Sequence, residues 1–180
     1  VFTSLWPVRT EPAQRRALSR AVEALAAMLR TVTGDRDALD RAEAEFYDQI
    51  SRARQYAVPV WFERTHSERG SILTVVQGLF IPIHAIVRTP APATASPAAR
   101  AALSSANAGV SGWLHAFATV VASNAPAPPL PLQDPAIATL ERVATDEDET
   151  AATRAHVHQQ LEWLELLHAQ CVDLAERGPT

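Results

Sequence analysis

The stretch EPAQRRALSRAVEALAAMLRTVT, residues 11–33, decides the fold because it reads as one long amphipathic helix. Apolar side chains recur in it at steps of three and four residues, while arginines occupy another face. Pro12 suits a first helical turn, where its missing N–H costs nothing, so we predict that the helix starts at Glu11 and Pro12. Gly34 is the predicted stop. The apolar stripe consists of Leu18, Val22, Leu25, Leu29 and Val32.

Two further apolar stripes follow Gly34. Asp35 or Asp37 can cap a second helix, which Pro59 ends. A linker then leads to a third helix, whose apolar face is broad enough to be central to the core. Pro82 lies inside this helix and opposes the carbonyl of the residue four positions earlier, so we expect a kink or a break there. The stripes consist of Leu39, Ala42, Phe46, Ile50, Ala53 and Ala57, and of Ile72, Val75, Val76, Leu79, Ile83, Ile86 and Val87.

Proline-rich segments flank the fourth helix. Ser96 followed by Pro97 is a good N-cap and first-turn pair, and the helix that they begin runs to about Asn124. The segment APAPPLPLQ, residues 125–133, contains too many prolines to be helical and is expected to form a semi-rigid strap. The buried side of the helix consists of Leu103, Val110, Leu114, Phe117 and Val121.

Two more helices complete the chain. Asp134 and Pro135 begin a short fifth helix. A sixth follows the acidic run DEDE at residues 146–149 and stops at Gly178. No stretch alternates apolar and polar residues with a period of two, so no strand is expected. The inward side chains are Ile137, Leu140 and Val143 in the fifth helix and Val157, Leu161, Leu164, Cys171 and Leu174 in the sixth.

These patterns predict an all-α fold, a helical bundle of about six helices with mostly antiparallel neighbours and a third helix kinked near Pro82. The 180 residues suffice for one core, which we place in a single helical domain over residues 11–178, behind a lead-in over residues 1–10. The formal net charge of -4 argues against a nucleic-acid partner. The single cysteine is compatible with the reducing cytoplasm. No apolar stretch is long enough to cross a bilayer, so we expect a soluble domain.

No motif predicts catalysis, a cofactor or a metal site, and we expect no enzyme. His156 and His158 point away from each other on a helix, and the pair His158 and Glu162 is one or two ligands short of a zinc site. We interpret them as a solvated helix face. The acidic run lacks the spacing of a calcium loop. Cys171 lies on an apolar stripe, where a thiol is inert.

The segment WFERTH, residues 61–66, is the strongest polar and aromatic cluster. An aromatic carboxylic acid could stack on Trp61 while Arg64 holds its carboxylate and His66 supplies a pH-sensitive neighbour. The alternative is that Trp61 and Phe62 plug the end of the bundle. Trp113 and His115, on the fourth helix, call for the same caution, since an aromatic residue at helical spacing usually belongs to the core.

The segment LWPVRTEPAQRRALSRAVEALAAMLR, residues 5–30, resembles the place where proteins of the bacterial FUSC family leave the membrane and begin their cytoplasmic helices. That family includes fusaric acid resistance proteins and aromatic acid exporters. Tryptophan favours the membrane interface and arginines just beyond a span favour the cytoplasmic side. The residues that carry the resemblance are Leu5, Trp6, Pro7, Arg9, Arg15, Arg16, Leu18, Leu25 and Leu29.

The resemblance implies a cytoplasmic domain of an efflux protein of the bacterial inner membrane, with an assembly, regulatory or substrate-receiving role. Trp6, Arg9, Arg15 and Arg16 would then lie near the membrane. Its partners would be the membrane portion of the same protein, an aromatic small molecule and a second copy in a homo-oligomer. The start at Val1, without methionine, is typical of a piece of a larger protein. The alternatives are a free-standing helical ligand-binding or regulatory domain and a structural dimerisation bundle.

Overall fold

The computed structural model describes residues 7–31, 35–56, 67–123, 125–130 and 135–176, with side chains described from residue 12 in the first range and from residue 72 in the third. These ranges contain six helices and no strand, which confirms the predicted all-α bundle. The helices are α1 (Pro7–Arg30), α2 (Arg36–Tyr56), α3 (Ser67–Arg88), α4 (Pro97–Ser123), α5 (Pro135–Thr145) and α6 (Ala151–Glu176).

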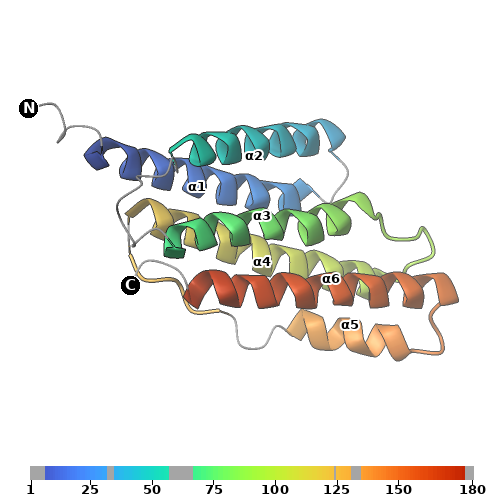
Figure 1. The fold of residues 1–180 in the computed structure, drawn as a ribbon. Coiled ribbons are helices and arrows are strands. Elements are labelled where there is room, and N and C mark those ends of the chain that lie inside the picture. Colours follow the sequence, from blue (N-terminus) through green and yellow to red (C-terminus); the bar gives the residue numbers. More distant parts are fainter. Residues whose placement is uncertain (1–6, 32–34, 57–66, 124, 131–134, 177–180) are drawn as a thin grey trace, which may run out of the picture.

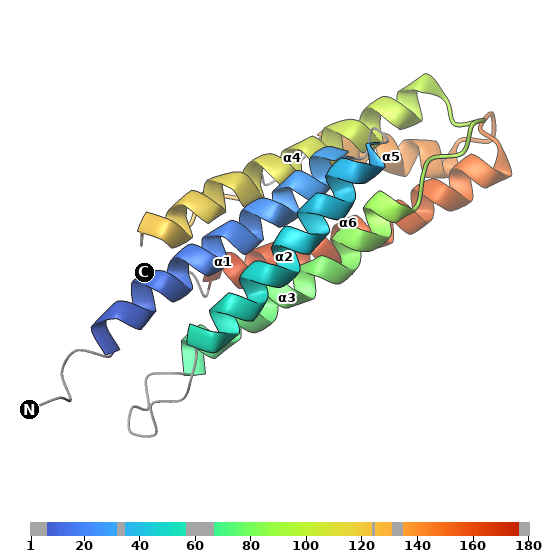
Figure 2. The ribbon, with the colours of Figure 1, turned by 90° about the horizontal axis from the view of Figure 1, so that it is seen from above.

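Consecutive helices run in opposite directions, as expected for a bundle joined end to end (Figure 1). Seen from above, the bundle is elongated, with α1 flanked by α2 and α4 (Figure 2). The most extensive packing is that of α1 against these two helices, and α1 also contacts α3. α6 packs on α3 and α5, and α5 also touches α4. We expected α3 to be the central helix, but α1 is the more widely packed.

The close packing of α1 follows from its composition. Ala21, Val22, Leu25, Ala26 and Met28 have no exposed surface. Small alanines let the neighbouring helices approach, while the leucines and the methionine fill the space between them. Within the described side chains, every residue of the predicted apolar stripes is buried or half-buried. Val32 and Ala57 lie outside the described residues.

Side-chain caps fix three helix starts. Ala38 N–H donates to Asp35 Oδ1 at 2.9 Å, which settles the choice between the two aspartates. Ala99 N–H donates to Ser96 Oγ at 3.1 Å, as predicted from the Ser-Pro pair. At the start of α6 the cap is Thr150, whose Oγ1 accepts from Thr153 N–H at 3.1 Å.

Of the two predictions based on prolines, the helix start at Glu11 and Pro12 is wrong, and at Pro82 only the break is excluded. α1 begins at Pro7 rather than at Glu11, and Pro12 lies inside it. Pro7 itself fits a first turn, so the later proline is not needed as the start. α3 continues through Pro82 to Arg88, so the helix does not break there. The buried side chains on both sides of Pro82 hold α3 in place; a bend of its axis remains a prediction.

Within the described residues, no helix has the length and apolar character needed to cross a membrane.

Candidate functional site

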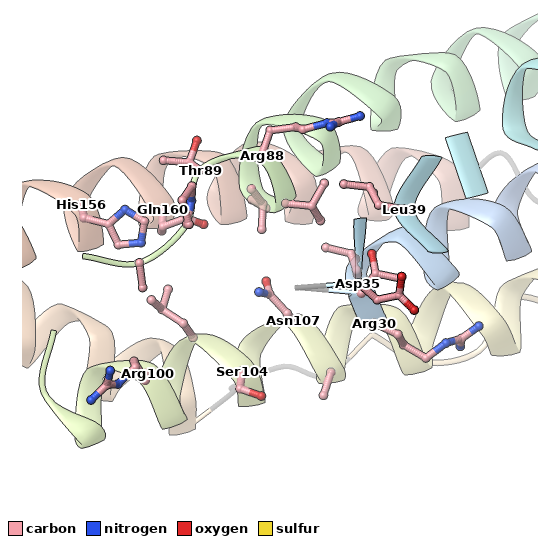
Figure 3. A pocket seen from close by; sticks show the side chains of 18 of the residues that line it. Arg30, Asp35, Leu39, Arg88, Thr89, Arg100, Ser104, Asn107, His156 and Gln160 are labelled. Atoms are coloured by element: carbon pink, nitrogen blue, oxygen red, sulfur yellow. The ribbon is translucent and has the colours of Figure 1, made fainter. Parts of the chain in front are cut away.

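A cavity of about 680 Å³ lies at the end of the bundle where α1 connects to α2 and where α3 connects to α4. Its walls come from the last turn of α1, the first turns of α2, the end of α3 and the loop after it, and the first halves of α4 and α6. Residues from five helices thus share one space (Figure 3). Much of the wall is apolar and is built by Leu29, Leu39, Ile86, Val87 and Leu103.

Three polar side chains, Asn107 from α4 and His156 and Gln160 from α6, point into this space (Figure 3). They are deeply buried, with exposed fractions of 4%, 8% and 2%. Asn107 Oδ1 and Gln160 Nε2 have no hydrogen-bond partner among the described residues. A buried polar atom without a partner costs about 1–3 kcal/mol, so most proteins avoid it. These atoms are the strongest chemical signal in the cavity.

Burial lowers the pKa of His156 from its ordinary value of 6.5, because desolvation disfavours the charged imidazolium. The imidazole is therefore neutral at neutral pH. The interpretation of the two neighbouring histidines as a solvated helix face is correct for His158, which is exposed, and wrong for His156. Residues two apart on a helix face different ways, so one can be buried while the other meets water.

The arginines of the cavity lie at its rim. Arg88 donates to Asp40 and to Glu43, both at 3.0 Å, and Arg30 pairs with Glu23 at 3.2 Å. Figure 3 shows both of these side chains running away from the open space. The exposed side chains of Arg36 and Arg100 have no ion-pair partner among the described residues. Arg30 and Arg88 are therefore held by carboxylates outside the open space.

The cavity can accept a small organic molecule with an apolar body and an uncharged polar group. Its volume lies within the range of about 300–1,000 Å³ that is usual for ligand sites, and its mixture of apolar walls and a few convergent polar groups is also typical of them. No protein-family profile, curated protein or solved structure matches this chain. Function is therefore inferred from the cavity and from the residues around it.

The sequence predicted other residues for a site. Trp61, Arg64 and His66 fall outside the described residues, and so does Trp6. Among the residues expected near a membrane, Arg9 lies on α1 without a described side chain, Arg15 is half-buried and Arg16 is exposed.

The polar residues of the cavity were missed, although the sequence holds a signal for all three of them. His156 and Gln160 are four residues apart, beside the apolar stripe of α6, so both turn towards the core side. Asn107 similarly lies four residues after the buried Leu103. Polar residues in core-facing positions of a helix indicate either a buried hydrogen bond or a site.

Three other candidate groups have structural explanations. Burial raises the pKa of the Cys171 thiol to about 12, so it is no nucleophile. Trp113 is buried and stacks on Phe117 with ring centroids 5.1 Å apart, as expected for a core aromatic. The acidic run at 146–149 is fixed by Arg154, which donates to the carbonyl of Glu149 at 2.6 Å. In the part of the chain with described side chains, no cluster of three or more His, Cys, Asp or Glu is arranged to hold a metal ion.

Proposed function

We propose that this bundle binds a small organic molecule in the cavity between α1, α3, α4 and α6, and that it does so as the substrate-receiving cytoplasmic domain of an efflux protein similar to the FUSC family. The observation that carries the first part is the set of buried polar side chains, Asn107, His156 and Gln160, that face a cavity of about 680 Å³. A ligand that pairs with the two partnerless atoms removes their desolvation cost.

Ligand binding explains these residues better than a purely structural bundle does. A bundle that serves only to pair copies of itself gains nothing from partnerless amides in its interior, because apolar side chains of the same size would pack there at no cost. Polar groups that converge on a cavity are instead the usual means of orienting a ligand. The cavity therefore favours binding over scaffolding.

The efflux context has separate support. The segment that resembles the membrane exit of the FUSC family ends in α1, and the last turn of α1 contributes Leu29 and Arg30 to the cavity. The same helix would thus connect a membrane portion to the ligand. The apolar walls also suit the aromatic and other organic compounds that the resemblance implies.

Ligand-observed NMR with small two-ring aromatic probes tests binding. The panel is naphthamide, naphthoate and naphthylmethanol, and we expect the unmodified chain to bind at least one of them. Ala108 is exposed and lines the cavity, so Ala108→Trp should abolish binding by filling it. Ala101, an exposed residue of α4 outside the cavity wall, supplies the matched control. Ala101→Trp should bind like the parent chain.

No binding of any probe would contradict the proposed site, and equal binding by the two tryptophan variants would move the site elsewhere. The efflux context has its own test in the parent reading frame. We expect apolar segments of about 20 residues next to this region. Hydrophilic neighbours on both sides would remove the efflux role and leave ligand binding intact.

A further inference from the structure

We infer that the cavity selects an uncharged ligand that carries a hydrogen-bond donor and an acceptor side by side, such as a primary carboxamide, over the carboxylate of the same shape. This inference rests on the proposed function, since it specifies the ligand of that same cavity. The sequence had suggested the opposite chemistry, an aromatic acid held by an arginine. The described side chains support a neutral ligand in three steps.

The first step is the complementarity of the two partnerless atoms. Asn107 Oδ1 is an acceptor that needs a donor, and Gln160 Nε2 is a donor that needs an acceptor. A carboxamide supplies an NH₂ to the former and a carbonyl oxygen to the latter. A carboxylate supplies acceptors only, so one of its oxygens would face the oxygen of Asn107. A carboxamide therefore pairs with both residues, whereas a carboxylate pairs with one and is repelled by the other.

The second step is the charge balance in the depth of the cavity. Asn107 and Gln160 carry no charge, and His156 is held neutral by its burial. Arg30 and Arg88 point away from the open space and are paired with carboxylates of α1 and α2 (Figure 3). A carboxylate that enters would lose its water without gaining an opposite charge, which is among the costliest changes in protein interiors.

The third step concerns the attraction of the two other cavity arginines for an anion. Arg36 and Arg100 line the cavity and are exposed, so either could attract an anion to its mouth. An ion pair in such an exposed place contributes only about 0–1 kcal/mol, because water screens it. Burying a carboxylate against neutral amides costs more than that. The rim attraction is therefore too small to reverse the preference set by the buried groups.

Isothermal titration calorimetry of the full chain with naphthamide and naphthoate at neutral pH tests the inference. These probes share their ring and shape and differ in the charge and donors of one group. We expect naphthamide to bind at least about tenfold more tightly than naphthoate, as a single buried hydrogen bond can provide. Asn107→Leu keeps the volume and removes the amide, so it should weaken naphthamide about tenfold. Arg20 is an exposed arginine of α1 outside the cavity wall, so Arg20→Gln should leave naphthamide binding unchanged.

The possible results distinguish failure of the inference from failure of the proposed function. Naphthoate binding as tightly as naphthamide, or more tightly, overturns the selectivity while the cavity remains a ligand site. Unchanged naphthamide binding by both Asn107→Leu and Gln160→Met also overturns it, and the second variant serves if the first fails to fold. Binding of naphthylmethanol alone overturns the carboxamide preference but keeps the site, whereas binding of no probe overturns both proposals.

Discussion

The two halves of α4 bury polar side chains in opposite ways. In the second half, residues 111–123, two buried donors form hydrogen bonds with neighbouring segments. Ser111 Oγ donates to the carbonyl of Ala26 at 2.8 Å, and Trp113 Nε1 donates to the carbonyl of Pro128 at 3.3 Å. In the first half, residues 97–108, Asn107 is as deeply buried as these residues, yet its Oδ1 has no partner among the described residues.

The difference teaches that burial alone does not identify a site. Both halves carry the same helical periodicity and pack into the same core. The second half lies against α1 and the proline-rich strap, where neighbouring backbone carbonyls satisfy its donors. The first half borders the cavity instead, and the Oδ1 of Asn107 meets no backbone donor there among the described residues. The partner of a buried polar atom is therefore more informative than its depth.

Substitution of two leucines of α4 should give the largest difference in stability between the two halves. Leu114 has no exposed surface in the packed half, and Leu103 borders the cavity in the other half. Leu114→Ala should lower the free energy of unfolding by about 3–5 kcal/mol, because it opens a new void in close-packed surroundings. Leu103→Ala should cost only about 2 kcal/mol, since part of its surface already faces open space. Urea denaturation measures both, and equal losses would contradict the contrast in packing.

A polar pair tests the same contrast at a smaller scale. Ser111→Ala removes a satisfied buried hydrogen bond and should cost about 1 kcal/mol. Asn107→Leu replaces a partly unsatisfied amide by an apolar group of similar size, so the free energy of unfolding should rise or stay within about 0.5 kcal/mol. Urea denaturation in the absence of ligand again gives both values. A loss with Asn107→Leu larger than that with Ser111→Ala would show that Asn107 serves the fold rather than a ligand.

The sequence predicts the helices well because their signals are local. Three- and four-residue spacing locates the buried stripes, and Asp35 and Ser96 act as caps where their side chains suggest it. Proline signals are less reliable, as Pro12 and Pro82 both lie inside helices. A proline removes one backbone hydrogen bond, and tertiary packing of the surrounding apolar side chains can offset that loss.

The cavity could not be predicted because it depends on tertiary arrangement. It requires the end of α1, the end of α3 and the first half of α6 to meet, and no periodicity states which helix ends adjoin. The depth of Asn107 and Gln160 follows from the same arrangement. What the sequence does show is that polar residues stand next to apolar stripes. That pattern could direct attention to Asn107, His156 and Gln160 without revealing that they share one cavity.

The smallest expected effect concerns pH. Because burial lowers the pKa of His156 below its ordinary value of 6.5, the unfolded chain binds a proton there more readily than the folded chain. This contribution to stability is therefore complete above about pH 6.5 and is lost as the pH falls through the lower, folded pKa. His156→Gln should flatten the pH dependence of the free energy of unfolding in that acidic window. His158→Gln removes an exposed histidine from the same helix and should keep the parent profile. If the two variants gave the same profile, the imidazole of His156 would not be held neutral by its burial at the cavity, and the interior beside Asn107 would not be free of charge.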